Sequence, residues 1–475
     1  MKSGLFCDLY ALTMANSYFL ASKHEEIVYF DVFFRSIPEN GGYAVFAGLE
    51  TTLKFLKEVR FTKSEINYLK KLGIFAHEFL RYLEQFRFKG EVYSFKEGSL
   101  VFAKEPILTI KGTLLECQLI EAFVLNSVNF ETLIATKAAR IVRASKGKAV
   151  FEFGTRRAHS ESAATKGARC AYLAGASATS NVLAGKDFKI PVVGTMAHSY
   201  VQAFEDEYTA FLTWAKHNPQ NISLLLDTYS TLQSGLKNAI KLQKEVLDKL
   251  NLKVSSVRID SGDIAYLSKT IRKELDNAGM GFTKICATNS LDEYIITDLL
   301  ANQGAEVDLF GVGERLITAS RQPVLGAVFK LAACVENNQT IPKIKVSGTS
   351  EKITIPGVKE VFRIYKSGKA IGDLIALKGE NQADLKEVYT LSEQHSTHVI
   401  DKAELRPVRL LVFKAGENLF KDSLVKARKR MQSQLKEVWP EVLRLSNPHP
   451  FYIDISKKLK ELQTDLISKL GGQSA

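Results

Sequence analysis

The chain has 475 residues, a formal net charge of +12 and a hydrophobic fraction of 45%. This length predicts two or three domains rather than one core, and no uninterrupted apolar run reaches the ~18 residues of a membrane span. The five cysteines are scattered without a CxxC pair, which argues against a structural zinc site and is typical of reduced thiols buried in a cytoplasmic protein.

The excess of positive charge indicates an anionic partner, either nucleic acid or phosphorylated small molecules. The densest basic run, "VKARKR" at 425–430, is followed by a helical pattern and is interpreted as the solvated face of a helix. No segment interleaves aromatic and basic residues as base-stacking surfaces do. We therefore expect small anionic substrates, with no nucleic acid and no membrane as partner.

Residues 1–125 are expected to form an N-terminal α+β domain. Within them, "EIVYFDVFFRSIP" and "GSLVFAKEPILTIKGTL" alternate or run apolar between Gly and Pro residues, as strands do. The following stretch, residues 113–145, has helical spacing and predicts two helices.

Residues 126–334 are expected to form the catalytic domain. Six short apolar runs, each followed by a helical pattern, end at Gly154, Gly194, Asp227, Asp260, Asn289 and Gly313. This rhythm predicts repeated βα units in a parallel sheet and favours a β/α barrel over an open sheet, although the pattern alone allows both. Residues 335–475 are strand-rich and then helical, and we expect them to pack with the N-terminal domain.

The ends of these runs carry an unusual set of polar residues. Ligands of parallel α/β proteins bind at the carboxyl ends of the strands, where Arg156 and Arg157 could clamp phosphate or form surface ion pairs. The glycines of "FGVGERL" could bring amides to a phosphate or form a tight turn. In "RIDSGD", Asp260 and Asp263 could hold Mg²⁺ or ribose hydroxyls, or Asp263 could cap the next helix.

A single histidine, His198, lies between the run ending at Gly194 and a helical pattern. Ser199 and Gln202 match an S-x-x-Q capping box, which predicts Ser199 as the N-cap and His198 just outside the helix. A phosphate on His198 would then face the positive end of that helix. Taken alone, a histidine at such a junction is more often a turn or core residue.

Seven motifs in one order resemble the nicotinate phosphoribosyltransferase family over residues 8–318: "DLYALTM", "FEFGTRRAHS", "TSNVLAG", "GTMAHSYVQAF", "LLLDTYS", "VRIDSGD" and "FGVGERLIT". The resemblance implies an irregular β/α barrel beside a β-rich second domain formed by the N- and C-terminal segments. It implies transfer of phosphoribosyl from phosphoribosyl pyrophosphate to nicotinate, which gives nicotinate mononucleotide and pyrophosphate in NAD biosynthesis. It also implies Mg²⁺, ATP hydrolysis through a phosphohistidine, and a homodimer with shared active sites.

The same resemblance implies the roles of individual residues. His198, which would be phosphorylated, Asp260 and Arg258 would be catalytic. Nicotinate would be bound by Tyr10, reaching over from the partner subunit, and by Phe153, Thr195, Arg258, Ser180 and Asn181. Phosphoribosyl pyrophosphate would be bound by Arg156, Asp227, Asp260, Asn289, Ser290, Gly311, Gly313 and Glu314. Some relatives carry a small hydroxyl residue in place of Glu314, so we expect its backbone amide to serve.

Two alternatives stay open at this point. A nicotinamide-specific relative would place an acidic acceptor near the ring, whereas "TSNVLAG" offers Thr179, Ser180 and Asn181 with no acid, which favours nicotinate. The alternative from another class is a basic RNA-binding protein with a degenerate barrel, whose aromatic and basic surface segments are missing from the sequence.

Overall fold

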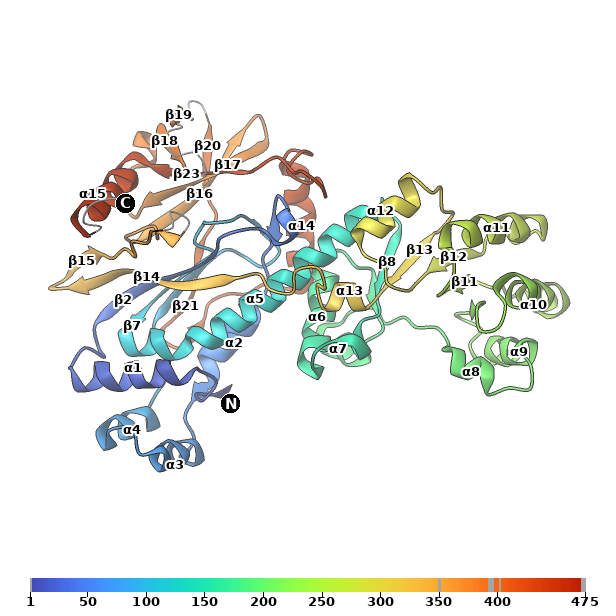
Figure 1. Ribbon diagram of the computed structural model, residues 1–475, viewed down its shortest axis with the longest axis horizontal. Coiled ribbons are helices and arrows are strands. Elements are labelled where there is room, and N and C mark those ends of the chain that lie inside the picture. Colours follow the sequence, from blue (N-terminus) through green and yellow to red (C-terminus); the bar gives the residue numbers. More distant parts are fainter. Residues whose placement is uncertain (1, 349–351, 392–396, 401–402, 471–475) are drawn as a thin grey trace. The chain divides into compact units, whose positions relative to one another are not determined.

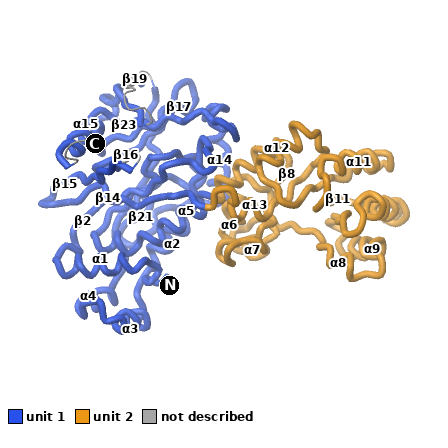
Figure 2. The backbone as a smooth tube through the Cα atoms, viewed as in Figure 1, with its two compact units in different colours: residues 1–133, 324–475 blue, residues 134–323 orange. Residues whose placement is uncertain are grey.

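The computed structural model describes residues 2–348, 352–391, 397–400 and 403–470. The chain divides into two compact units (Figure 2). Unit 1 combines residues 1–133 with residues 324–475, and unit 2 consists of residues 134–323.

Unit 1 is built on two large sheets (Figure 1). The first is antiparallel, with the strand order β15-β14-β2-β7-β5-β21-β22. Its strands are β2 (Ile27–Phe34), β5 (Glu91–Ser94), β7 (Leu108–Thr113), β14 (Ala327–Glu336), β15 (Gln339–Pro342), β21 (Leu410–Lys414) and β22 (Glu417–Asn418). Strand β2 pairs with both β7 and β14. Residues 327–334, which the sequence analysis assigns to the catalytic domain, therefore lie in this sheet.

The second sheet of unit 1 is mixed and comes from the C-terminal segment. Its order is β19-β18-β23-β17-β16-β20, with β16 (Lys359–Lys366), β17 (Lys369–Leu377), β18 (Glu387–Thr390), β19 (Thr397–Val399), β20 (Glu404–Pro407) and β23 (Tyr452–Ser456). A buried ion pair of 2.8 Å joins Lys359 of β16 to Asp31 of β2, so the two sheets share one interior. Such a pair persists in a core because each buried charge has its partner.

The helices of unit 1 and two short strand pairs complete that unit. The pairs are β1 (Lys2–Ser3) with β4 (Val59–Arg60) and β3 (Ala44–Val45) with β6 (Leu100–Val101). The helices are α1 (Leu9–Leu20), α2 (Leu49–Glu58), α3 (Lys63–Leu72), α4 (His77–Glu84), α14 (Leu424–Glu437) and α15 (Lys457–Leu470). The basic run 425–430 lies on α14, as the sequence analysis expects.

A single helix, α5 (Leu114–Ala144), continues from unit 1 into unit 2. The prediction of two helices was wrong, because no Gly or Pro interrupts these 31 residues and nothing forces a break. By length and composition α5 is the one helix among the described residues that could cross a membrane, but 61% of its most apolar window is buried inside the protein. That burial is typical of a core helix.

Unit 2 contains six parallel strands in the order β10-β11-β12-β13-β8-β9. They are β8 (Ala149–Glu152), β9 (Ala178–Thr179), β10 (Ser223–Leu225), β11 (Ser256–Ile259), β12 (Lys284–Ala287) and β13 (Leu309–Val312). The pairing of β8 with β13 joins the first and the last of these strands along the chain, as in a barrel. Over residues 134–323 no ladder joins β9 to β10, so the sheet is a curled half-barrel that stays open there. The predicted fold, an irregular β/α barrel beside a β-rich domain, is confirmed.

All but one of the predicted runs form a barrel strand. The exception is the run that ends at Gly194, which forms a single isolated parallel β-bridge, between Val192 and Thr179. The remaining strand, β9, was missed because its two residues are too short to show a period.

Helices follow the strands and cover the sheet of unit 2. They are α6 (Glu161–Leu173), α7 (Val182–Phe188), α8 (His198–Gln202), α9 (Glu207–His217), α10 (Leu236–Leu242), α11 (Ile264–Asn277), α12 (Glu293–Ala301) and α13 (Glu314–Ile317). Five begin with a side-chain cap, from Ser160, Asn181, Asp206, Asp263 or Asp292. Each cap satisfies an amide that the helix leaves without a partner. Because the helices begin directly after strands, their first turns border the carboxyl ends of the sheet.

Candidate active site

A cavity of about 430 Å³ opens at the carboxyl ends of the strands of unit 2. The structure brings most of the predicted site residues into its lining: Phe153, Arg156, Ser180, Thr195, Arg258, Asp260, Asn289, Ser290, Gly311, Gly313 and Glu314. Asn181, Asp227 and His198 lie outside the lining, and Tyr10 belongs to α1 of unit 1. The cavity is therefore polar, with cations, carboxylates and glycine amides around one aromatic ring.

One end of the cavity is organised by Arg258 of β11. Its guanidinium donates to Thr195 Oγ1 and, at 3.3 Å, to the carbonyl oxygen of Met196. A second terminal nitrogen lies 3.9 Å from Asp260 Oδ1, and the buried Nε has no hydrogen-bond partner among the described residues. Arg258 thus keeps donor capacity for a carboxylate, the group that a guanidinium recognises best.

The aromatic wall is Phe153, which lies directly after β8. Its amide donates to the carbonyl of Val312 at 2.8 Å, and its ring lies against the backbone of Gly311. A Cβ at position 311 would stand 2.7 Å from the ring and 2.6 Å from Thr288 Cγ2, which explains why the sequence has glycine there. The close approach fixes the ring at the cavity wall.

The buried carboxylate of Glu152, the residue before Phe153, holds the backbone next to this ring. Its two oxygens accept hydrogen bonds from the Gly154 amide and from Thr179 Oγ1, so it connects the exits of β8 and β9. Burial raises the pKa of Glu152, although these two hydrogen bonds oppose the rise. Asn181, at the exit of β9, is buried and caps α7 by accepting from the Ala184 amide at 2.9 Å.

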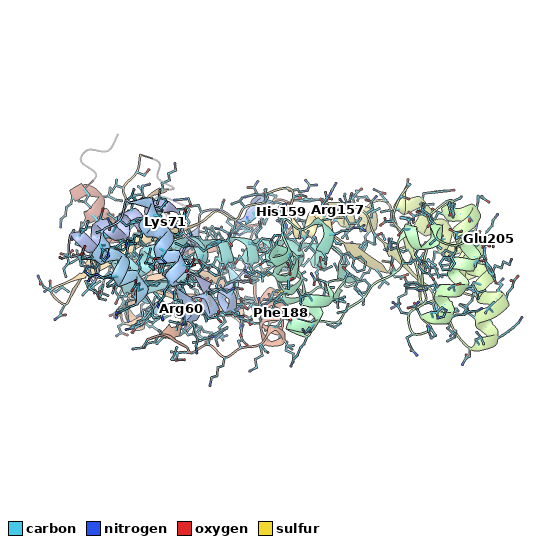
Figure 3. The ribbon with its side chains drawn as sticks, turned by 90° about the horizontal axis from the view of Figure 1, so that it is seen from below. Arg60, Lys71, Arg157, His159, Phe188 and Glu205 are labelled. Atoms are coloured by element: carbon cyan, nitrogen blue, oxygen red, sulfur yellow. The ribbon has the colours of Figure 1, made fainter. Side chains whose placement is uncertain are left out.

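Another part of the cavity lining comes from the exits of β12 and β13. Asn289 and Ser290 both have left-handed backbone, with φ of 81° and 49°, a strain that recurs at ligand-binding turns. Gly313 and Glu314 belong to the same cavity lining. The exposed carboxylate of Glu314 lies 3.5 Å from Arg157, which Figure 3 shows beside His159 at the edge of unit 2.

Sequence reasoning missed Thr288 as a cavity residue. Its hydroxyl donates to Asp260 Oδ1 and it lines the cavity. The apolar run there was predicted to end at Asn289, with Thr288 counted within the strand, whereas β12 ends at Ala287 and Thr288 is the first polar residue after it.

The histidine His198 is the first residue of α8, and Ala197 is the N-cap without a side-chain bond. The prediction of Ser199 as N-cap was wrong, because Ala197 already has the extended backbone of a cap, with φ −97° and ψ 164°. His198 Nδ1 lies 3.2 Å from Thr228 Oγ1, and Nε2 lies 3.7 Å from Asp260 Oδ2. The ring is 39% exposed, so a reagent can reach it.

The carboxylates of Asp227 and Asp263 make different local contacts. Asp227 Oδ2 accepts from the Asp260 amide at 3.1 Å and from Ser261 Oγ, while its buried Oδ1 has no partner among the described residues. Asp263 Oδ1 accepts from the Tyr266 amide at 2.9 Å and caps α11, which is the helix-capping alternative of the sequence analysis. The described residues contain no group of three or more His, Cys, Asp or Glu side chains arranged for a metal.

Three family models match the chain. They are described as the N-terminal domain of nicotinate phosphoribosyltransferase over residues 5–129, the nicotinate phosphoribosyltransferase family over residues 149–367, and its C-terminal domain over residues 358–463. The chain is 44% identical to the nicotinate phosphoribosyltransferase of Bacillus subtilis over 95% of its own length and 93% of that protein. It belongs to the nicotinate phosphoribosyltransferase family.

Solved structures agree with this family. Human nicotinic acid phosphoribosyltransferase superimposes with a TM-score of 0.84 at 28% identity, covering 97% of this chain and 100% of the human one. A nicotinate-nucleotide pyrophosphorylase from Pyrococcus furiosus, at 22% identity and a TM-score of 0.70, covers 91% of this chain and 95% of its own and has a similar fold. The protein is therefore an enzyme of the nicotinate phosphoribosyltransferase family, and the RNA-binding alternative is not supported.

Proposed function

We propose that the protein transfers the phosphoribosyl group of phosphoribosyl pyrophosphate to the ring nitrogen of nicotinate, releasing nicotinate mononucleotide and pyrophosphate. The observation that carries this proposal is one cavity whose lining contains both a guanidinium and a glycine-rich pair of turns with left-handed backbone. The guanidinium can bind the carboxylate of nicotinate, and the glycine-rich turns can bind a sugar phosphate. We also propose a cytoplasmic location, where buried thiols stay reduced.

Nicotinate would be held by Phe153, Thr195 and Arg258. The ring would stack on Phe153, whose face is fixed by Gly311. The carboxylate would accept from Arg258 and from the Thr195 hydroxyl, which already form one hydrogen-bonded pair. Ser180, the cavity residue at the exit of β9, is uncharged and presents no carboxylate to repel this substrate.

Phosphoribosyl pyrophosphate would lie across the remaining part of the cavity. The amides of Asn289, Ser290, Gly311 and Gly313 and the backbone of Glu314 would surround the 5′-phosphate, and Arg156 would bind phosphate oxygens. Asp260 would hold the ribose hydroxyls, since Thr288 and Arg258 fix its carboxylate.

Cleavage of the bond to pyrophosphate develops positive charge on the ribose and negative charge on the leaving group. Asp260 and Asp227 would stabilise the positive charge on the ribose. Mg²⁺ would supply charge stabilisation for the leaving group when it is bound. Its preference for one or two carboxylates together with substrate phosphates fits Asp260 and the unpartnered Oδ1 of Asp227. Asp263 fits less well, because it already caps α11.

We propose that ATP phosphorylates His198 and that hydrolysis of this phosphohistidine accompanies the transfer. Thr228 holds the ring through Nδ1, and Nε2 faces Asp260. A phosphate on His198 would lie outside the cavity lining but close to Asp260, which belongs to that lining. Its negative charge would therefore change the electrostatic potential at Asp260.

We further propose a homodimer with shared sites. In unit 1, the side chains of Phe6, Leu9 and Tyr10 are exposed, and in unit 2 those of Val182 and Val192 are exposed. Exposed apolar side chains in such groups mark association surfaces. Tyr10, with about half of its surface exposed, would cover the nicotinate of the partner subunit.

The specificity of the purified protein tests the proposal. We expect kcat/KM for nicotinate to exceed that for nicotinamide by about tenfold or more, because the charge-assisted bonds of Arg258 need a carboxylate. An equal rate with both substrates, or a preference for nicotinamide, would overturn the substrate assignment. Release of pyrophosphate without either base would overturn the proposed transfer.

A further inference from the structure

An ionic cluster next to the exit of β12 is centred on Asp292, the N-cap of α12. Its Oδ1 accepts from the amides of Tyr294 and Ile295 at 3.1 and 2.9 Å. Its Oδ2 accepts from Arg315 at 2.9 Å and from Arg321 at 3.1 Å. Asp292 itself is completely buried, so both of its oxygens are used and neither faces the cavity.

This carboxylate links two parts of the chain that meet at the cavity. Asp292 lies two residues after Ser290, and Arg315 follows Gly313 and Glu314 on α13. The short helix α13 has four residues and no side-chain cap. It is held by the buried side chains of Leu316 and Ile317 and by the salt bridge from Arg315 to Asp292.

The cluster is anchored on its far side as well. The guanidinium of Arg321 lies 4.4 Å from the centre of the Tyr294 ring, and the Tyr294 hydroxyl accepts from Arg140 of α5 at 2.8 Å. Burial alone would raise the pKa of Asp292, but the Ile295 amide, Arg321 and Arg315 lower it. The carboxylate is therefore ionised and held in one position.

We infer that Asp292 is a positioning residue for the phosphate end of the site. It fixes the separation between the turn at Asn289 and Ser290 and the turn at Gly313 and Glu314, without touching substrate. This inference rests on the proposed function, since it assigns the phosphate of phosphoribosyl pyrophosphate to those turns. It predicts an effect that depends on the substrate, because Arg258 and Thr195, which would bind the carboxylate of nicotinate, bond to each other and to Met196 and not to this cluster.

The test compares Asp292→Asn and Arg315→Met with the unchanged full-length protein. KM for phosphoribosyl pyrophosphate is expected to rise about tenfold or more, since small misplacements of binding groups are costly, while KM for nicotinate stays within about twofold. Arg315→Lys keeps a cation near Asp292 and is expected to recover part of the loss. Equal changes in both KM values, or no change in either, would overturn the inference.

Two controls separate positioning from folding. Asp206 caps α9 by accepting from the Thr209 amide at 2.8 Å and lies outside the cavity lining. Asp206→Asn therefore neutralises a similar capping carboxylate while it keeps the capping oxygen, and it should leave both KM values unchanged. If Asp292→Asn does not fold, Arg315→Met decides, because it leaves the cap of α12 intact. Calorimetric binding of phosphoribosyl pyrophosphate to each variant tests the inference even if the unchanged protein forms no nicotinate mononucleotide, a result that would instead contradict the proposed function.

Discussion

Replacing Arg258 by lysine separates recognition of the substrate carboxylate from the rest of the site. Arg258 donates to Thr195 and Met196 with one nitrogen, and its remaining nitrogens can bind a carboxylate. Lysine keeps the charge, but it presents a single ammonium group in place of the planar fork. Arg258→Lys therefore loses at least one charge-assisted hydrogen bond to nicotinate while the site stays electrically unchanged.

The size of the effect follows from the type of bond. A hydrogen bond to a charged group contributes about 1.5–3 kcal/mol, compared with about 0.5–1.5 kcal/mol for a neutral one. At about 1.4 kcal/mol for each factor of ten, kcat/KM for nicotinate should fall about 10- to 150-fold. The fall for nicotinamide should be smaller, because its bond to Arg258 is charged on the guanidinium side only, whereas nicotinate loses contact between two opposite charges.

The assay is the ratio of kcat/KM for the two substrates, measured in the same preparation. Arg272→Lys is the matched control: Arg272 has a similar side-chain exposure, 16% compared with 14% for Arg258, but its guanidinium bonds to α11 and to carbonyls outside the cavity. The control should leave the ratio unchanged. The reasoning is refuted if Arg258→Lys lowers both substrates by the same factor, or if the ratio shifts equally in Arg272→Lys.

Three further predictions follow from the same contacts. His198→Ala should abolish labelling of the protein by ATP that carries a labelled γ-phosphate, and it should keep a slow transfer that needs no ATP. The control variant His217→Ala should be labelled normally. Label retained in His198→Ala would exclude His198 as the acceptor. A mixture of refolded Tyr10→Ala and Arg258→Ala subunits should recover roughly a quarter of the normal activity, since half of the dimers are mixed and each has one complete site; a mixture no more active than its components would contradict shared sites. The lowered pKa of Asp292, which lies below its ordinary value of 3.8, contributes stability that is fully present above about pH 4 and is lost as the pH falls through the folded pKa. In urea unfolding, the difference between the unchanged protein and Asp292→Asn should therefore be constant near neutral pH and shrink below about pH 4, and a difference that grows in acid would reverse the assigned sign.

The sequence predicted those parts of the site that are encoded locally. A strand buried on both faces is a short apolar run, and its carboxyl end is marked by the first polar residue or glycine. Asp260, Asn289 and Gly313 were found in this way, and the structure brings all three to one cavity. The helix cap at Asp263 is local as well, since the bond spans three residues. The cap at Asn181 is equally local but was not predicted, because Asn181 was assigned to nicotinate by resemblance.

The parts that the sequence did not predict depend on contacts between distant residues or on very short elements. Strand β9 has two residues, and the run ending at Gly194 only bridges it, so neither has a readable period. The role of Asp292 requires its pairing with Arg315, 23 positions away, and periodicity carries no information about that pairing. The start of α8 was misplaced by two residues because a capping motif is present in sequence, but the backbone at Ala197 begins the helix first.

The most direct test of the proposed reaction is to incubate the purified protein with nicotinate, phosphoribosyl pyrophosphate and Mg²⁺, with and without ATP, and to quantify both products. The proposed mechanism predicts equal amounts of nicotinate mononucleotide and pyrophosphate, and an increase in both when ATP is present and hydrolysed. The absence of nicotinate mononucleotide under both conditions would contradict the proposed function. Formation that is unaffected by ATP would contradict the role assigned to His198 and leave the transfer itself supported.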